Sequence, residues 1–341
     1  MEFDSRATLV GFLAAAAVLG GLLWLVGPGR IGRTLSMLDP WAAALVLLLG
    51  LAWLFSWGLA LRRVLGALDV AVSVRDGFLL YASAVFANNV TPFGQAGGEP
   101  FSALLISRAT ESEYESGLAA IASVDTLNFV PSIVFSVVGL SYYVARFAVG
   151  DSILFVFGVV LALAVAVPAL GAVAWRYRTS VEARIAALVY PVWRGLSRHL
   201  PGVGVPTREA VGRRVDGFFR SIERVASNRR DLAVALAYST VGWLCTCLAL
   251  YVSLRALAPT THVAVFVVFV VVPVASIASI TPLPGGTGSV EAVLVLLLVP
   301  TTGVTAATAA SAALVYRGAV YWVPLLVGGG AVAWLQARTT R

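Results

Sequence analysis

Long apolar runs with few or no charges dominate the chain and alternate with short charged segments. A run of about 20 apolar residues is long enough to cross a bilayer as a helix. Six unbroken runs of this kind occur, at residues 7–29, 40–61, 116–145, 152–175, 232–254 and 305–335. The first begins without a net basic segment before it, so we interpret it as an uncleaved membrane helix and not as a signal peptide.

Two further apolar stretches are interrupted by proline and glycine. Residues 78–90 predict a half-helix that ends at a Thr-Pro pair, and residues 100–107 predict a short returning half-helix that begins at Pro100. Residues 256–290 carry no formal charge and are too long for one span; a second Thr-Pro and glycine cluster divides them before a half-helix at 292–300.

The two breaks share one pattern: Thr-Pro, a glycine cluster, then a single Glu. The hairpin backbone residues are Thr91, Pro92, Gly97 and Gly98 in the first break, and Thr281, Pro282, Gly285, Gly286, Gly288 and Ser289 in the second. Backbone freed from helical bonding is tolerated at membrane depth only where protein or a water-filled cavity satisfies it. Paired breaks in corresponding halves of a chain point to a transport site.

The order of elements predicts an inverted repeat. If each broken element enters and leaves on one side, each half reads span, span, re-entrant hairpin, span, with three crossings. The predicted repeats are residues 1–147, with a break near 91–99, and residues 148–341, with a break near 281–291. The predicted fold is therefore an all-α polytopic membrane protein with six full spans and two re-entrant hairpins, the second repeat upside down.

Residues 176–230 interrupt the second repeat with 12 of the 24 arginines. Apolar residues at alternating four- and three-residue steps predict two helices joined by a turn at residues 200–206. This cytoplasmic helical hairpin either packs on itself or the bundle, or lays an Arg-rich face on an anionic leaflet. With the N-terminus inside, predicted cytoplasmic segments carry 19 Arg against 4 outside, so we expect a cell-membrane protein with both termini cytoplasmic.

Composition excludes a soluble globular protein. The chain is 59% hydrophobic and 12% charged, with a mean hydropathy of +0.90. The net charge of +7 lies mostly on residues 176–230, which favours contact with lipid headgroups over nucleic acid. The two Cys and two His lack the spacing of a metal site, and the sequence shows neither an ATP-binding loop nor a catalytic motif. We therefore predict no metal, no cofactor and no enzymatic activity.

Four ionisable residues fall within predicted membrane segments, where such groups are costly. Glu99 and Glu291 each stand where a half-helix begins, so either could cap the helix dipole or bind substrate. Free N–H groups in the glycine clusters could bind an anion. Arg317 requires an anionic partner: a carboxylate of Glu291, Glu99 or Asp125, or the headgroup of a substrate.

A set of neutral and acidic polar residues accompanies these charges. Asp125 and Asn128 share one helix face, and Asn88 and Asn89 precede the first break. Two hypotheses remain for this set: hydrogen bonds between helices, or the lining of a substrate path.

The stretch from Thr281 to Glu291 resembles the most telling motif of a flippase-like membrane family, one related to the transmembrane domain of lysylphosphatidylglycerol synthase. Asn88 to Pro100 and Tyr316-Arg317 to Pro324 are similar to two other blocks of that family. The resemblance implies lipid translocation, with anionic or polyprenyl-linked membrane lipids as partners and a separate lipid-modifying enzyme. No soluble domain follows the last span, so aminoacyl transfer is not expected on this chain.

The predicted function is a lipid flippase or scramblase that moves a polar headgroup past the two hairpin tips. One alternative is an ion-coupled secondary transporter of a small solute, because re-entrant hairpins suit that function equally. A second is an accessory protein or enzyme of lipid-linked glycan synthesis, and a third is a purely structural role. Oligomeric state is not predicted.

Overall fold

The computed structural model describes residues 17, 19–22, 24–91, 95–146, 162, 166, 169–170, 173, 176–197 and 207–339. Within these residues the secondary structure is helical and contains no strand, which confirms the all-α prediction. Five helical segments are long and apolar enough to cross a membrane, and they are listed by their bounds: Pro40–Ala67, Tyr114–Tyr142, Arg229–Leu257, Pro284–Thr302 and Ala306–Arg338. The chain is a multi-pass membrane protein.

The helices follow the predicted apolar runs. In chain order they are α2 (Pro28–Leu35), α3 (Pro40–Ala67), α4 (Val74–Val90), α5 (Gln95–Thr110), α6 (Tyr114–Arg146), α8 (Arg178–Ser197), α9 (Arg208–Ser227), α10 (Arg229–Leu257), α11 (Val265–Ile277), η1 (Ala278–Ile280), η2 (Pro284–Gly286), α12 (Ser289–Thr302), α13 (Ala306–Arg317), the π-helix η3 (Gly318–Trp322) and α14 (Val323–Thr339). The predicted spans at 40–61, 116–145, 232–254 and 305–335 are confirmed as α3, α6, α10 and α13–α14. The predicted end of the run at 7–29 is wrong, because the helix is interrupted at Gly27, with a φ of +99°, and α2 begins at Pro28. The start of that run, most of 152–175 and the turn at 200–206 lie outside the described residues.

A second predicted boundary is wrong. The returning half-helix of the first break begins at Gln95, and Pro100 lies inside α5 instead of at its first position. Pro100 is the sixth residue of α5, so its missing N–H removes one intrahelical hydrogen bond. The earlier start places Gly98 directly against Asn88 of α4, where any side chain would collide with the Asn88 backbone.

Two hydrophobic clusters form the core. One joins α10, α11, α12 and α13, and the other joins α3, α4, α5, the start of α6 and the end of α14. Small residues bring helices into backbone contact, which is how membrane helices associate without a hydrophobic drive between them. At Gly328 of α14, for example, a methyl group would overlap the carbonyl oxygen of Ala82 in α4.

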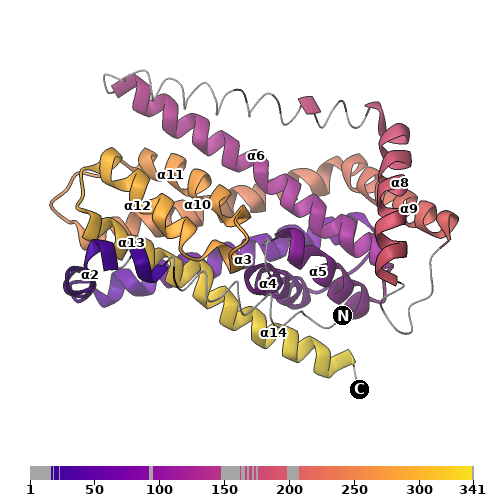
Figure 1. The fold of residues 1–341 in the computed structure, drawn as a ribbon, viewed down its shortest axis with the longest axis horizontal. Helices are drawn as coiled ribbons and strands as arrows, with labels where there is room; N and C mark the ends of the chain where they lie inside the picture. Colours follow the sequence, from indigo (N-terminus) through magenta and orange to yellow (C-terminus); the bar gives the residue numbers. More distant parts are fainter. Residues whose placement is uncertain are drawn as a thin grey trace.

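Charged residues collect at one end of the bundle, hereafter the charged end. Four ion pairs lie there, each linking segments far apart in sequence: Arg63–Asp231, Arg224–Asp69, Arg214–Glu115 and Arg338–Asp76. They join the end of α3, the start of α4, the start of α6, α9, the start of α10 and the end of α14. Figure 1 shows α8, α9 and the C-terminus at this end and α2 with α11–α13 toward the other.

The helical pair predicted at 176–230 is confirmed as α8 and α9, which pack on each other. Val211, Val215 and Val225 of the predicted apolar stripe are buried, and α9 also packs against α6. The apolar stripe therefore serves packing on the bundle; contact of the arginines with a leaflet stays a prediction.

Each broken element folds as a helical hairpin. Asn88 near the end of α4 contacts Gly98 near the start of α5. Asp76 at the start of α4 and Arg108 near the end of α5 line one hollow at the charged end. Hence α5 returns to the end of the bundle from which α4 started. In the second element α12 packs beside α11, and the Ser289 hydroxyl contacts the Ala278 carbonyl.

Candidate functional site

The second break is a compact turn that requires glycine. After η1 the chain is extended at Thr281, and Gly285, Gly286 and Gly288 have φ of +55°, +62° and +88°. A methyl group at Gly285 would also overlap the ring of Tyr321. Only glycine adopts this backbone at no steric cost, so the glycine cluster of the sequence encodes the shape of the break.

Hydroxyl groups satisfy the freed backbone of this turn. The Ser289 hydroxyl lies 2.8 Å from the Gly286 carbonyl oxygen and 2.9 Å from the Thr281 hydroxyl. The Thr287 hydroxyl donates to the Pro284 carbonyl oxygen at 2.9 Å. Buried carbonyl groups left unpaired would destabilise the fold, so these small polar residues are what permit a non-helical segment here.

A buried ion pair closes the turn. Glu291 Oε2 accepts a hydrogen bond from the Gly288 backbone N–H at 2.7 Å, and Glu291 Oε1 accepts from Arg317 Nε at 2.9 Å. Arg317 Nη2 donates to the Gly285 carbonyl oxygen at 2.9 Å, and the guanidinium lies 4.3 Å from the Tyr321 ring centroid. Glu291 thus caps α12 and is the carboxylate that pairs with Arg317, whereas a role in substrate binding stays a prediction.

The helix changes from α to π geometry directly after Arg317. Arg317 ends α13, and the next five residues form the π-helix η3 before α14 continues. Single π-helical turns inside α-helices are rare and frequently occur at functional sites. Because Tyr321 lies within η3, the π turn places its ring under the Arg317 guanidinium.

The first break meets the second. Helix α4 ends at Val90, and the Thr91 hydroxyl donates to the Ala87 carbonyl oxygen at 2.7 Å. A methyl group at Gly285 would lie 2.9 Å from the Asn89 side-chain oxygen, so Asn89 touches the second turn directly. Pro92, which begins the glycine segment of the first break, lies outside the described residues.

Glu99 and Asp125 form a pair of neighbouring carboxyl groups next to the first break. Asp125 of α6 is 8% exposed, and its carboxyl group is within interaction distance of the Glu99 carboxyl group on α5. Tyr81 of α4 is a further neighbour of Asp125. Two carboxyl groups at this spacing repel each other when both are ionised, so a proton or a cation between them stabilises the arrangement.

Asn128, one turn from Asp125, joins helices. Its side-chain oxygen accepts a hydrogen bond from the Ser239 hydroxyl at 2.6 Å, and its backbone carbonyl oxygen accepts one from Trp243 Nε1 at 2.8 Å. For this residue the hypothesis of interhelical hydrogen bonding is the one the contacts support.

Several buried polar atoms at the junction have no hydrogen-bond partner within the described part of the chain. They are Asn88 Oδ1, Asn89 Nδ2, Asp125 Oδ2 and Asn128 Nδ2. Buried groups of this kind are uncommon in folded proteins and each requires an explanation. We call the set formed by Glu99, Asp125, Asn88, Asn89, Glu291 and Arg317 the polar seam.

A family model matches nearly the whole chain. The family model described as lysylphosphatidylglycerol synthase TM region matches residues 9–328. The chain belongs to this family. Two UPF0104 membrane proteins of Methanothermobacter thermautotrophicus (strain ATCC 29096 / DSM 1053 / JCM 10044 / NBRC 100330 / Delta H) are similar to part of it. One is 33% identical over 135 residues, covering 39% of this chain and 38% of the relative; the other is 26% identical over 142 residues, covering 40% of each.

In this member of the lysylphosphatidylglycerol synthase TM-region family, Glu291 is one of the partners predicted for Arg317, and two further contacts of Arg317 were not predicted. The Gly285 carbonyl group and the ring of Tyr321 both contact Arg317. Tyr321 follows Arg317 by four residues, a spacing that places two side chains on one helix face and could have indicated the contact. Within the described residues no group of three or more His, Cys, Asp or Glu could hold a metal ion.

Proposed function

We propose that this protein is a lipid flippase or scramblase whose polar path is the seam between the two broken elements. The observation that carries the proposal is the contact between Asn89 and Gly285, beside a buried Glu291–Arg317 pair and unpartnered polar atoms. A phospholipid headgroup cannot pass bare through hydrocarbon at physiological rates, because moving a charged group there costs many kcal/mol. A line of polar atoms inside the protein lowers that cost while acyl chains stay in the bilayer.

Arg317 suits the role of a headgroup ligand. A guanidinium carries five N–H donors in a planar fork that matches phosphate oxygens. Nε and Nη2 are engaged by Glu291 and Gly285, whereas Nη1 forms no hydrogen bond with the described residues. An arriving phosphate can therefore bind Nη1 without first breaking the ion pair.

The proposal includes a membrane arrangement. The charged end faces the cytoplasm of a cell membrane, with both chain termini there, since Lys and Arg residues favour that side. The α4–α5 hairpin enters from the charged end and the α11–α12 hairpin from the other, in two inverted repeats spanning residues 1–147 and 148–341. Transport without a covalent step then needs only movement of the repeats against each other.

A second candidate, an ion-coupled transporter of a small solute, rests on a different observation. The neighbouring Glu99 and Asp125 carboxyl groups suit a proton or cation that binds and leaves during a cycle. The same pair could energise lipid movement, so the two candidates differ in what is carried and not in the coupling site.

The proposal is tested with purified full-length protein in vesicles that contain headgroup-varied fluorescent phospholipids, using dithionite to bleach the outer leaflet. We expect wild type to move lipid, and Glu291→Gln, Arg317→Ala and Glu99→Gln to slow it by at least about tenfold, the value of one charge-assisted hydrogen bond. The exposed residues Glu209→Gln and Arg230→Ala provide matched controls that retain wild-type rates.

Two results would contradict the proposal. Folded wild-type protein that leaves the inner-leaflet lipid protected refutes lipid movement. Substrate-dependent ion flux in the same vesicles, without lipid movement, identifies the solute transporter instead. If all three seam variants fold and move lipid as wild type does, the path lies elsewhere.

A further inference from the structure

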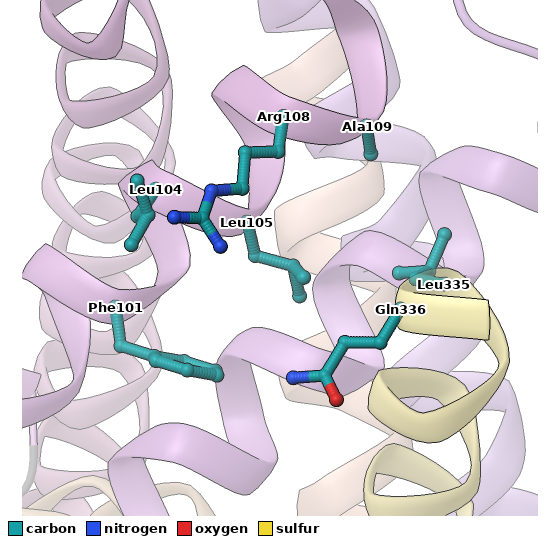
Figure 2. Close-up of a pocket in the computed structure, with 7 residues that line it drawn as sticks. All are labelled: Phe101, Leu104, Leu105, Arg108, Ala109, Leu335 and Gln336. Carbon is teal, nitrogen blue, oxygen red and sulfur yellow. The ribbon is translucent and has the colours of Figure 1, made fainter. Parts of the chain in front are cut away.

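A groove with apolar and charged halves lies between α5 and α14 near the charged end. Its apolar wall comprises Phe101, Leu104 and Leu105 of α5 and Leu335 of α14. Figure 2 shows the Arg108 guanidinium between the Leu104 and Leu105 side chains, with Phe101 and Gln336 lower in the view. Past Arg108 the groove continues into a hollow of about 590 Å³ with polar walls, formed in part by Asp76, Thr110, Glu111 and Arg338. We call the whole feature the lateral groove.

Arg108 stands at the boundary between the two halves, since it lines both. It is exposed and forms no ion pair or hydrogen bond with the described residues. Arg338, the other arginine of the hollow, is paired with Asp76 at 3.3 Å and stacks on Trp334. The lateral groove therefore offers a guanidinium that has no ion-pair partner among the described residues and lies beside an apolar cleft.

We propose that the lateral groove is the site where a glycerophospholipid leaves the leaflet at the charged end, with its phosphate on Arg108. The inference rests on the proposed lipid movement and assigns it an entry point. Charge complementarity selects the phosphate, because guanidinium and phosphate form bidentate, charge-assisted hydrogen bonds. The apolar wall selects a lipid over a soluble anion, because Leu104, Leu105 and Phe101 would face an acyl chain.

The spacing of residues along α5 suits this occupant. Phe101 and Arg108 are separated by about 10 Å along α5, the distance from a lipid phosphate into the upper acyl region. The polar hollow falls within the roughly 300–1,000 Å³ that small-molecule sites occupy. Glu99 lies on the same helix about 13 Å from Arg108, so α5 connects the lateral groove to the polar seam.

Binding, not transport, tests this inference. Detergent-purified full-length protein is titrated by native mass spectrometry with dioleoylphosphatidylglycerol, with dioleoylglycerol, which lacks phosphate, and with glycerol phosphate, which lacks acyl chains. We expect wild type to prefer phosphatidylglycerol over both. Arg108→Ala should weaken its binding at least about tenfold, the usual value of a hydrogen bond to a charged group.

A second variant tests the apolar half. Leu104→Trp should fill the cleft and reduce phosphatidylglycerol binding, whereas Leu326→Trp, at a position of α14 that is 75% exposed and outside the groove, should not. Arg230→Ala removes an exposed charge elsewhere at the charged end and should bind as wild type.

The inference is overturned if Arg108→Ala and Leu104→Trp bind phosphatidylglycerol as wild type does, or if glycerol phosphate binds as tightly as the lipid. The vesicle assay separates the two claims. Wild type that moves lipid, with binding insensitive to Arg108, refutes the entry site and leaves the transport proposal standing. Arg108-dependent binding with no lipid movement refutes the transport proposal and leaves the lipid-binding site standing.

Discussion

Replacing Glu291 with Gln should strongly destabilise the protein, because it leaves the Arg317 guanidinium charged, buried and without its counter-ion. The two side chains are 4% and 8% exposed and meet at 2.9 Å, so water screens the pair little. Breaking such a pair by removing one partner costs about 3–5 kcal/mol. With an unfolding entropy of about 2 cal/mol/K per residue over 341 residues, we expect the thermal unfolding midpoint to fall by roughly 4–7 °C.

Arg317→Met should lower the free energy of unfolding by less, about 2 kcal/mol, because the Glu291 carboxylate keeps the Gly288 N–H and the start of α12 as stabilising partners. The double variant removes both charges together and should lie close to Arg317→Met. The expected coupling energy between the two positions is therefore at least about 2 kcal/mol.

The assay is a double-mutant cycle measured by SDS titration in mixed micelles, with tryptophan fluorescence as the probe and all four proteins in the same detergent. Effects that add to within about 0.5 kcal/mol would show that Glu291 and Arg317 do not interact in the folded protein. In that case the buried ion pair, and with it the closure of the second break, is wrong.

Three further changes test the packing of the bundle by the same titration. Gly285→Ala should cost at least about 2 kcal/mol through its positive φ and its overlap with an aromatic ring, and an unchanged stability would exclude the turn described here. Gly328→Ala should cost about 1–3 kcal/mol because it separates α14 from α4, whereas its neighbour Gly330, which has no atom near the position of an added methyl, should tolerate Ala to within about 0.5 kcal/mol. Arg214→Ala removes an exposed ion pair and should change stability by less than about 1 kcal/mol; a larger loss would mean that α9 is held mainly by that pair.

The long helices could be predicted because a membrane span imposes a length and an apolar composition that few other structures share. Helices α3, α6 and α10 accordingly extend only a few residues beyond the predicted runs. The breaks could be predicted for a related reason: glycine and proline disfavour a continuous helix through their own backbone geometry, whatever surrounds them. The predicted start of α5 is wrong because proline is favourable at the first helical position, yet here Pro100 lies inside the helix.

The partners of the seam residues could not be predicted from local pattern. Arg317 had three candidate carboxylates, and the one it binds lies 26 residues away on another helix. Asn128 bonds to Ser239, 111 residues away, and nothing in either neighbourhood indicates the other. These choices depend on how the helices pack, which a single sequence does not display.

In the proposed arrangement, the two broken elements enter the bilayer from opposite faces and meet inside it. Spin labels at Ile280→Cys, which is 72% exposed at the tip of the second hairpin, and at Val90→Cys, at the tip of the first, report their depth by collision with oxygen and a nickel chelate. With Cys245 and Cys247 replaced by Ala, we expect both labels near the bilayer midplane, roughly 15 Å below either headgroup layer. Either label at the level of the headgroups would contradict it.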